Sequence, residues 1–282
     1  MNRKQFLAAA SAAAVASVLH GADAVPAGKK KPGIALQLYT LREPAKKDLA
    51  GTQKQAADMG WRYVQWSGMP NLPADKIRAA LDEAGLTCIA AHVSIEAFEK
   101  DFNRETAFWK TVGAIDVAPG SMPKAFSKDL AAWQEGARHL DALGAKLRSA
   151  GMRLSFHNHT SEFEQFADDP RTKIDILMEM TKPENLCAEL DIAWALAAGA
   201  DPAALIRKYA GRVPVVHAKD VLIDGKKKTL TALGKGSVQW QEVFAAGKEA
   251  GIEWYIYEQD SGQGTPFDFA RESFTFLSKL LQ

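Results

Sequence analysis

Residues 153–166, RLSFHNHTSEFEQF, combine an apolar run with three side chains that could do chemistry. His157 and His159 stand two positions apart, and Glu162 follows three positions later. Imidazole binds divalent metals and exchanges protons near neutral pH, and a carboxylate can serve in either role. One histidine at the end of a strand is more often a hydrogen-bonded structural group than a ligand. A metal or acid–base site here therefore requires further ligand-type side chains from elsewhere in the chain.

Three later apolar runs also end in side chains of this kind. Residues two apart in a strand point to the same face, so each run offers a pair of groups on one face. The pairs are His157 and His159 in LSFHNH, Glu189 and Asp191 in AELDIA, His217 and Lys219 in VVHAKD, and Glu258 and Asp260 in WYIYEQD. Histidine, aspartate, histidine and glutamate converging on one point suit a divalent transition metal. So many buried charges would be costly without a metal or a substrate.

The elements that must position these residues form a regular alternation. Amphipathic stretches, with apolar residues at three- and four-residue spacing, separate short apolar runs. The runs are GIALQLYT, WRYVQWSG, LTCIAAHVS, AIDVAPGS, MRLSFHNH, LCAELDIAW, VPVVHAKD and EWYIYEQD. Glycines of the helix C-cap type precede most of them, at Gly60, Gly85, Gly113, Gly151, Gly211 and Gly251. The pattern predicts an α/β protein, a (β/α)8 TIM barrel over residues 33–282, with its active face at the carboxyl ends of the strands. An open doubly wound sheet is the alternative, but no glycine-rich phosphate loop follows the first run.

Three groups on this face each have two interpretations. Lys219 could stabilise a developing oxyanion or pair with Asp260 or Glu189. Glu162 could act as a general acid or base, or it could be a residue of a helix N-terminus without chemistry. His159 could be a reserve metal ligand or a catalytic base. The residue types alone leave these alternatives open.

Residues 1–24 have the pattern of a secretory signal peptide. A basic pair is followed by an alanine-rich apolar run and by small residues up to Ala24. A membrane-anchored N-terminus is the alternative, although the run is short for a membrane span. The order RKQFL resembles a twin-arginine export signal in which Lys4 replaces the second arginine. Residues 25–32 read as a linker, and the protein is predicted to be periplasmic or secreted.

Composition limits the partners of the predicted mature chain. The whole chain has a formal charge of +1, and removing residues 1–24 takes away two basic residues and one acidic residue, which leaves zero. Neither a nucleic acid nor an anionic membrane is therefore predicted as a partner, and a homo-oligomer stays open. The two cysteines, Cys88 and Cys187, lie in apolar runs and read as buried free thiols.

Five motifs together resemble the sugar phosphate isomerase/epimerase family, whose members have xylose isomerase-like barrels. They are HNHTSEF, ELDIAWALAAGADP, HAKD, LGKGSVQW and GIEWYIYEQD, in this order from about Gly33 to the C-terminus. The resemblance implies a divalent metal, often manganese, held by Glu, Asp, His and Glu from strands five to eight. The last three ligands fall on Asp191, His217 and Glu258, and the first falls on or next to His157.

The chain departs from the ketose epimerases of this family at two positions. His157 stands where those enzymes keep a glutamate, and Trp194 stands where they have a histidine three residues after the aspartate. The epimerases use two glutamates on opposite faces of the substrate, one removing a proton and the other returning it. Proton removal next to a metal-polarised carbonyl, followed by elimination of the β-substituent, needs only one base and one acid. Inosose dehydratases and keto-glycoside lyases of the superfamily resemble this second scheme.

We therefore predict an exported, metal-dependent isomerase- or epimerase-type enzyme that acts on a small, unphosphorylated sugar or polyol. The reaction is enolisation next to the carbonyl of a keto-sugar or keto-glycoside, with β-elimination as a further possible step. The predicted metal ligands are His157, Asp191, His217 and Glu258, and the predicted catalytic groups are Glu162, His159, Lys219 and Glu258. Manganese is the first choice of metal, with zinc, cobalt, iron and magnesium as alternatives. A periplasmic carbohydrate-binding protein that kept the barrel without turnover is the alternative function. A metal-dependent endonuclease is disfavoured by the zero net charge.

Overall fold

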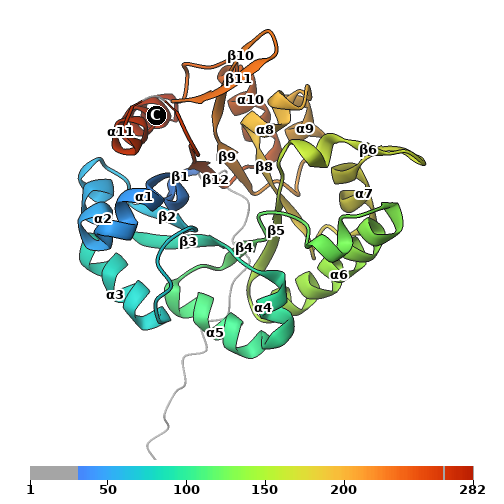
Figure 1. Cartoon of the computed structure of the whole chain (residues 1–282), viewed down its shortest axis with the longest axis horizontal. Coiled ribbons are helices and arrows are strands. Elements are labelled where there is room, and N and C mark those ends of the chain that lie inside the picture. Colours follow the sequence, from blue (N-terminus) through green and yellow to red (C-terminus); the bar gives the residue numbers. More distant parts are fainter. Residues whose placement is uncertain (1–30, 263, 282) are drawn as a thin grey trace, which may run out of the picture. The chain divides into compact units, whose positions relative to one another are not determined.

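Parallel strands close into a barrel in the computed structural model, which describes residues 31–262 and 264–281 (Figure 1). The barrel strands are β1 (Gly33–Gln37), β2 (Tyr63–Trp66), β3 (Thr87–His92), β4 (Asp116–Ala118), β5 (Arg153–His157), β8 (Cys187–Asp191), β9 (Val215–Ala218) and β12 (Trp254–Tyr257). Each lies in one of the eight apolar runs, and β12 pairs with β1 to close the sheet. The predicted TIM barrel is confirmed, and the open doubly wound sheet is wrong.

Helices surround the barrel and connect its strands (Figure 1). The α-helices are α1 (Arg42–Lys47), α2 (Leu49–Asp58), α3 (Ala74–Ala84), α4 (Ile95–Lys100), α5 (Phe102–Val112), α6 (Leu130–Ser149), α7 (Lys173–Met180), α8 (Ile192–Ala197), α9 (Pro202–Lys208), α10 (Trp240–Ala250) and α11 (Pro266–Leu280). Short 3-10 helices are η1 (Leu38–Leu41), η2 (Lys124–Phe126) and η3 (Thr160–Phe163). Gly85 and Gly251 have positive φ at the ends of α3 and α10, as the C-cap signal predicts.

Two small antiparallel hairpins extend the loops after β5 and β9. The first pairs β6 (Gln165–Phe166) with β7 (Asp169–Thr172), and the second pairs β10 (Asp220–Asp224) with β11 (Lys227–Thr231). The second hairpin lies near α8 and α10 in Figure 1. Neither hairpin was predicted: β6, β7 and β11 are short and mostly polar, and the apolar residues of β10 follow closely on the apolar run of β9. Both follow strands that end in predicted site residues.

Inside the barrel, an apolar layer lies below a polar one. The small interior core consists of Ala35, Ala90, Val215 and Ile256. Two positions further along the same strands, or just beyond their ends, are Gln37, His92, His217 and Glu258. Because residues two apart share a face, the strands that bring small apolar groups to the centre also bring polar groups to the mouth. A much larger apolar core lies between the strands and the helices.

Some sequence predictions fall outside the described residues. The predicted signal peptide, residues 1–24, and most of the linker, residues 25–32, are among them. Within residues 31–262 and 264–281, none of the helices has the length and apolar character that crossing a membrane requires. Of the two free cysteines, Cys88 is buried as predicted, whereas Cys187 is only half-buried because it begins its strand at the edge of the barrel.

Asp220, directly after the strand that carries His217, anchors the loop containing LGKGSVQW. Its fully buried carboxylate accepts hydrogen bonds from the backbone N–H groups of Val221, Gly234, Gly236 and Val238 and from the indole N–H of Trp240. A Cβ at Gly236 would lie 2.1 Å from Asp220 Oδ1, so this position requires glycine. The motif therefore encloses one carboxylate, and that carboxylate holds the chain next to Lys219.

Replacing Asp220 with alanine should destabilise the barrel by roughly 3 kcal/mol or more, because several buried N–H groups would lose their acceptor. Urea unfolding followed by tryptophan fluorescence measures the change. The matched control is Asp224→Ala at the exposed far end of the same strand, which should change the free energy of unfolding by less than about 0.5 kcal/mol. Equal effects of the two substitutions would contradict the anchoring role.

Candidate functional site

The four predicted metal ligands meet at the mouth of the barrel. One ligand atom from each of His157, Asp191, His217 and Glu258 lies within 4.8 Å of the others, and all four side chains are buried. We call these four residues the rim cluster. They come from the carboxyl ends of β5, β8 and β9 and from the residue after β12. His217 Nδ1 lies 3.0 Å from Glu258 Oε2, and His157 Nε2 lies 4.0 Å from Asp191 Oδ2.

Local hydrogen bonds fix the orientation of Asp191. This residue is the N-cap of α8, and its Oδ1 accepts a hydrogen bond from the backbone N–H of Trp194 at 2.9 Å. Its own N–H donates to Oδ1 of Asn158, the residue between the two histidines of β5 and its loop, at 2.9 Å. Asn158 thus points to the neighbouring strand, away from the rim cluster. The second oxygen of Asp191 is left facing His157 and Lys219.

Lys219 is a buried ammonium held by three carboxylates. Its Nζ lies 3.0 Å from Asp191 Oδ2, 2.7 Å from Glu258 Oε2 and 2.8 Å from Asp260 Oδ2. Burial alone would lower the pKa of Lys219, but these carboxylates raise it above its usual value, so the side chain stays charged. Pairing with Asp260 was one predicted interpretation and is observed. Glu189 binds histidines instead.

His217 connects the rim cluster to a deeper layer of the barrel. Its Nδ1 faces Glu258, and its Nε2 lies 2.9 Å from Glu189 Oε1. Burial alone would lower the pKa of His217, but the two carboxylates raise it to about 10. Burial lowers the pKa of His157, which is therefore neutral at ordinary pH. In the metal-free protein, one of the two rim imidazoles thus carries the charge.

The donor set of the rim cluster fits a divalent transition metal. Two imidazole nitrogens and two carboxylate oxygens are the mixed ligands that manganese, iron, cobalt and zinc accept in proteins. The four groups are buried, so ionised carboxylates there need a cation nearby. Lys219 supplies one positive charge for Asp191, Glu258 and Asp260 together. The protonated His217 adds a second positive charge beside Glu258, and a metal at the rim would replace its proton and neutralise the remaining negative charge.

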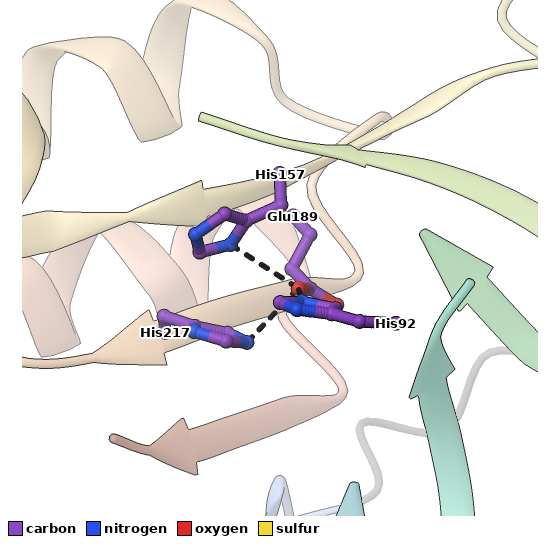
Figure 2. Close-up of side chains that lie close together, drawn as sticks. All are labelled: His92, His157, Glu189 and His217. Atoms are coloured by element: carbon purple, nitrogen blue, oxygen red, sulfur yellow. Dashed lines mark hydrogen bonds and ion pairs between the residues drawn. The ribbon is translucent and has the colours of Figure 1, made fainter. Parts of the chain in front are cut away.

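Two polar residues of the site, the half-buried His92 and the fully buried Glu189, were not among the predicted metal ligands or catalytic groups. His92, at the end of β3, approaches Glu189 of β8, with Nε2 2.6 Å from Oε1 (Figure 2). Both signals were in the sequence: His92 ends an apolar run, and Glu189 shares strand parity with Asp191. Their contact joins strands that are far apart in the sequence, on different sides of the barrel, so it depends on how the sheet closes.

His159 and Glu162 lie at the beginning of the loop after β5. The His159 ring packs edge-on against His157, with centroids 5.0 Å apart, and lies 5.9 Å from the Trp194 ring. Glu162 is buried in η3, where Oε2 accepts a hydrogen bond from the His159 backbone N–H at 2.7 Å and Oε1 accepts one from the Ser161 hydroxyl at 3.0 Å. Glu162 therefore holds the segment that carries His159. This agrees with its predicted alternative as a residue of a helix N-terminus. Its predicted acid–base role stays a prediction.

The fold and the site define a class of protein: a (β/α)8 barrel with imidazole and carboxylate groups clustered at the carboxyl ends of its strands. A model of the xylose isomerase-like TIM barrel family matches residues 53–280, and the chain belongs to this family. The predicted resemblance is confirmed at this level, and solved sugar phosphate isomerase/epimerase structures share the fold.

Three comparisons describe the likeness. Inosose dehydratase from Lacticaseibacillus casei is 27% identical over 163 residues, which cover 51% of this chain and 53% of that protein. The chain spans about half the length of the curated relatives it matches. A sugar phosphate isomerase/epimerase from Parabacteroides distasonis ATCC 8503 has a TM-score of 0.70 at 21% identity, covering 91% of this chain and 96% of that chain. An L-ribulose 3-epimerase has a TM-score of 0.67 at 17% identity, covering 89% and 94%. These two structures show the common fold.

Metal binding should release a proton from His217 and become tighter as the pH rises. A proton with a pKa of about 10 occupies this imidazole at neutral pH, and a cation at Nδ1 must displace it. The apparent affinity for Mn²⁺ should therefore increase by roughly tenfold for each pH unit between about pH 7 and 9. Titration calorimetry in buffers of different ionisation enthalpy measures the affinity and the proton count. A pH-independent affinity without proton release would contradict the charge state assigned to His217.

Proposed function

We propose that this protein is an exported, divalent-metal-dependent carbohydrate enzyme that enolises a keto-sugar or keto-glycoside next to its carbonyl and then eliminates the β-substituent. The observation that carries the proposal is the buried rim cluster with the charged Lys219 beside it. The printed names of the relatives, a dehydratase and an epimerase, describe reactions that begin with the same proton removal. Export and metal dependence are parts of the proposal.

The proposed chemistry needs a group that stabilises negative charge on the substrate oxygen. A divalent metal held by His157, Asp191, His217 and Glu258 would polarise the substrate carbonyl. Lys219 is a fixed, buried positive charge near the same place and would stabilise the enolate oxygen. Its three carboxylate partners keep it charged and hold it in position, so little reorganisation is needed during the reaction.

His159 is the proposed base. In the elimination, the proton on the carbon next to the carbonyl passes to His159, and its C–H electrons form the enolate. The enolate then re-forms the carbonyl and a carbon–carbon double bond as the bond from the β-carbon to oxygen breaks. The leaving oxygen takes a proton, which His159 can return, so the products are an enone and water or an alcohol. Glu162 positions the backbone of His159, and its use as the acid remains the alternative.

The charge around the site supports a neutral substrate. The carboxylates of Asp191, Glu258 and Asp260 surround a single ammonium at the mouth of the barrel. A phosphorylated sugar would bring negative charge close to these carboxylates, which opposes its binding. The proposed partner is therefore a small, unphosphorylated sugar or polyol. Neither nucleic acid nor membrane is part of the proposal.

The proposal is tested with Mn²⁺-loaded protein and a 3-keto-glycoside in heavy water, followed by NMR. We expect release of the aglycone and, because proton removal is reversible, deuterium at the carbon next to the carbonyl of the remaining substrate. Lys219→Met should lower the rate by about 100-fold or more by removing the charge that stabilises the enolate. Lys226→Met, in the exposed turn between β10 and β11, is the matched control and should keep the full rate.

The main rival outcome is a binding protein on the same barrel. Such a protein would bind the keto-sugar with measurable affinity and would catalyse neither exchange nor elimination. This result with a panel of keto-sugars and properly loaded metal would overturn the proposed enzyme. Exchange without elimination would instead mean isomerisation or epimerisation and would overturn the elimination step alone.

A further inference from the structure

We propose that His92, His157, Glu189 and His217 (Figure 2) form a second position for a divalent metal, centred on Glu189, which lies two residues earlier on β8 than the rim ligand Asp191. We call these four residues the deep cluster. It would take a zinc-type ion through three imidazole nitrogens and one carboxylate oxygen. The inference goes beyond the proposed function, since the proposed reaction uses neither His92 nor Glu189.

The geometry brings three imidazoles around one oxygen atom. Glu189 Oε1 lies 2.6 Å from His92 Nε2, 2.9 Å from His217 Nε2 and 3.3 Å from His157 Nδ1. Ligand atoms that surround a tetrahedral ion at about 2.1 Å are about 3.4 Å from one another. The separations of 2.6 and 2.9 Å are shorter than this value, and that of 3.3 Å is close to it, so the Glu189 carboxylate would move outward to make room for an ion.

The hydrogen bonding of the deep cluster is incomplete without a cation. Glu189 Oε1 is hydrogen-bonded to His92 Nε2 at 2.6 Å. His217 Nε2 lies 2.9 Å from the same oxygen, but its hydrogen bond is to Gln65 Oε1 at 2.7 Å. His157 Nδ1 is buried and has no aligned hydrogen-bond partner within residues 31–262 and 264–281. Buried polar atoms are rarely left in this state. A metal ion would bind this nitrogen and the other two rings through their lone pairs.

Two glutamines hold Glu189 in the orientation that a ligand needs. Gln65 Nε2 donates to Glu189 Oε2 at 2.7 Å, and Gln37 Nε2 donates to Gln65 Oε1 at 2.9 Å. Both glutamines are fully buried. One oxygen of Glu189 is thereby fixed to the barrel, and the other is presented to the histidines. Hydrogen bonds of this outer kind are typical of metal-binding carboxylates.

The two clusters share two rings but use opposite sides of them. His157 Nε2 and His217 Nδ1 face Asp191 and Glu258, whereas His157 Nδ1 and His217 Nε2 face Glu189. A neutral imidazole has one lone pair for a metal, so a single ion per chain occupies either cluster. Imidazole-rich sites favour zinc and cobalt, and carboxylate-rich sites favour manganese. The identity of the ion would therefore select its position.

Two residues separate the clusters experimentally, because His92 belongs only to the deep cluster and Asp191 only to the rim cluster. Metal-free full-length protein is titrated with Zn²⁺ by competition with a chromogenic chelator and with Mn²⁺ by electron paramagnetic resonance. His92→Gln should weaken Zn²⁺ binding by 100-fold or more and change Mn²⁺ binding by less than threefold. Asp191→Asn should weaken Mn²⁺ binding by 100-fold or more and change Zn²⁺ binding by less than threefold.

Controls keep the test independent of folding and of activity. His139→Gln replaces a histidine on α6, outside both clusters, and should change neither affinity. Thermal unfolding checks that each variant is folded, and Glu189→Gln provides a second deep variant with the same expected loss of Zn²⁺ binding. The inference is overturned if His92→Gln binds Zn²⁺ as tightly as wild type, or if Asp191→Asn loses both metals equally. Because the readout is metal affinity, failure of the proposed enzymatic activity leaves this result unaffected.

Discussion

The imidazole of His217 is completely buried between Glu189 and Glu258, and the arrangement of the site depends on this pairing. One contact reaches toward the mouth of the barrel and the other toward its centre, so the ring connects two layers of polar groups. Either carboxylate alone in this position would be costly to ionise. The ring makes both tolerable, and its charge can be exchanged for that of a metal ion. Proton and metal therefore compete for the same buried nitrogen.

The resemblance to the ketose epimerases predicts a glutamate ligand on or next to position 157, and the histidine found there changes the charge of this predicted ligand position. With a histidine here, the rim cluster contains one carboxylate fewer than the epimerase pattern. Burial lowers the pKa of His157, so this ring is neutral. Glu189 lies directly behind this ring, 3.3 Å from Nδ1. The site thus keeps a carboxylate near this position but places it one layer deeper. A carboxylate behind an imidazole can still increase the basicity of that imidazole as a ligand.

Much of the fold and of the rim cluster could be predicted from the sequence, for a simple physical reason. Apolar runs of strand length and glycine C-caps are local signals, and strand parity then assigns Asp191, His217 and Glu258 to one face. The pairing of His92 with Glu189 could not be predicted, because it depends on the diameter and register of the closed sheet. The sequence also could not decide which acidic residue pairs with Lys219, because several acidic groups lie at the ends of neighbouring strands.

The placement of Lys219 explains how an ammonium and the proposed metal ion could share one small site. The Asp220 carboxylate, bound by the LGKGSVQW loop, fixes the backbone directly after this lysine. The Lys219 N–H also donates to the His217 carbonyl at 3.0 Å, so the lysine and its neighbouring ligand move as one unit. A flexible lysine could swing into a metal position and occupy it. An ammonium held at both its backbone and its carboxylate partners instead remains a fixed charge beside the proposed metal position, as the proposed stabilisation of an enolate would require.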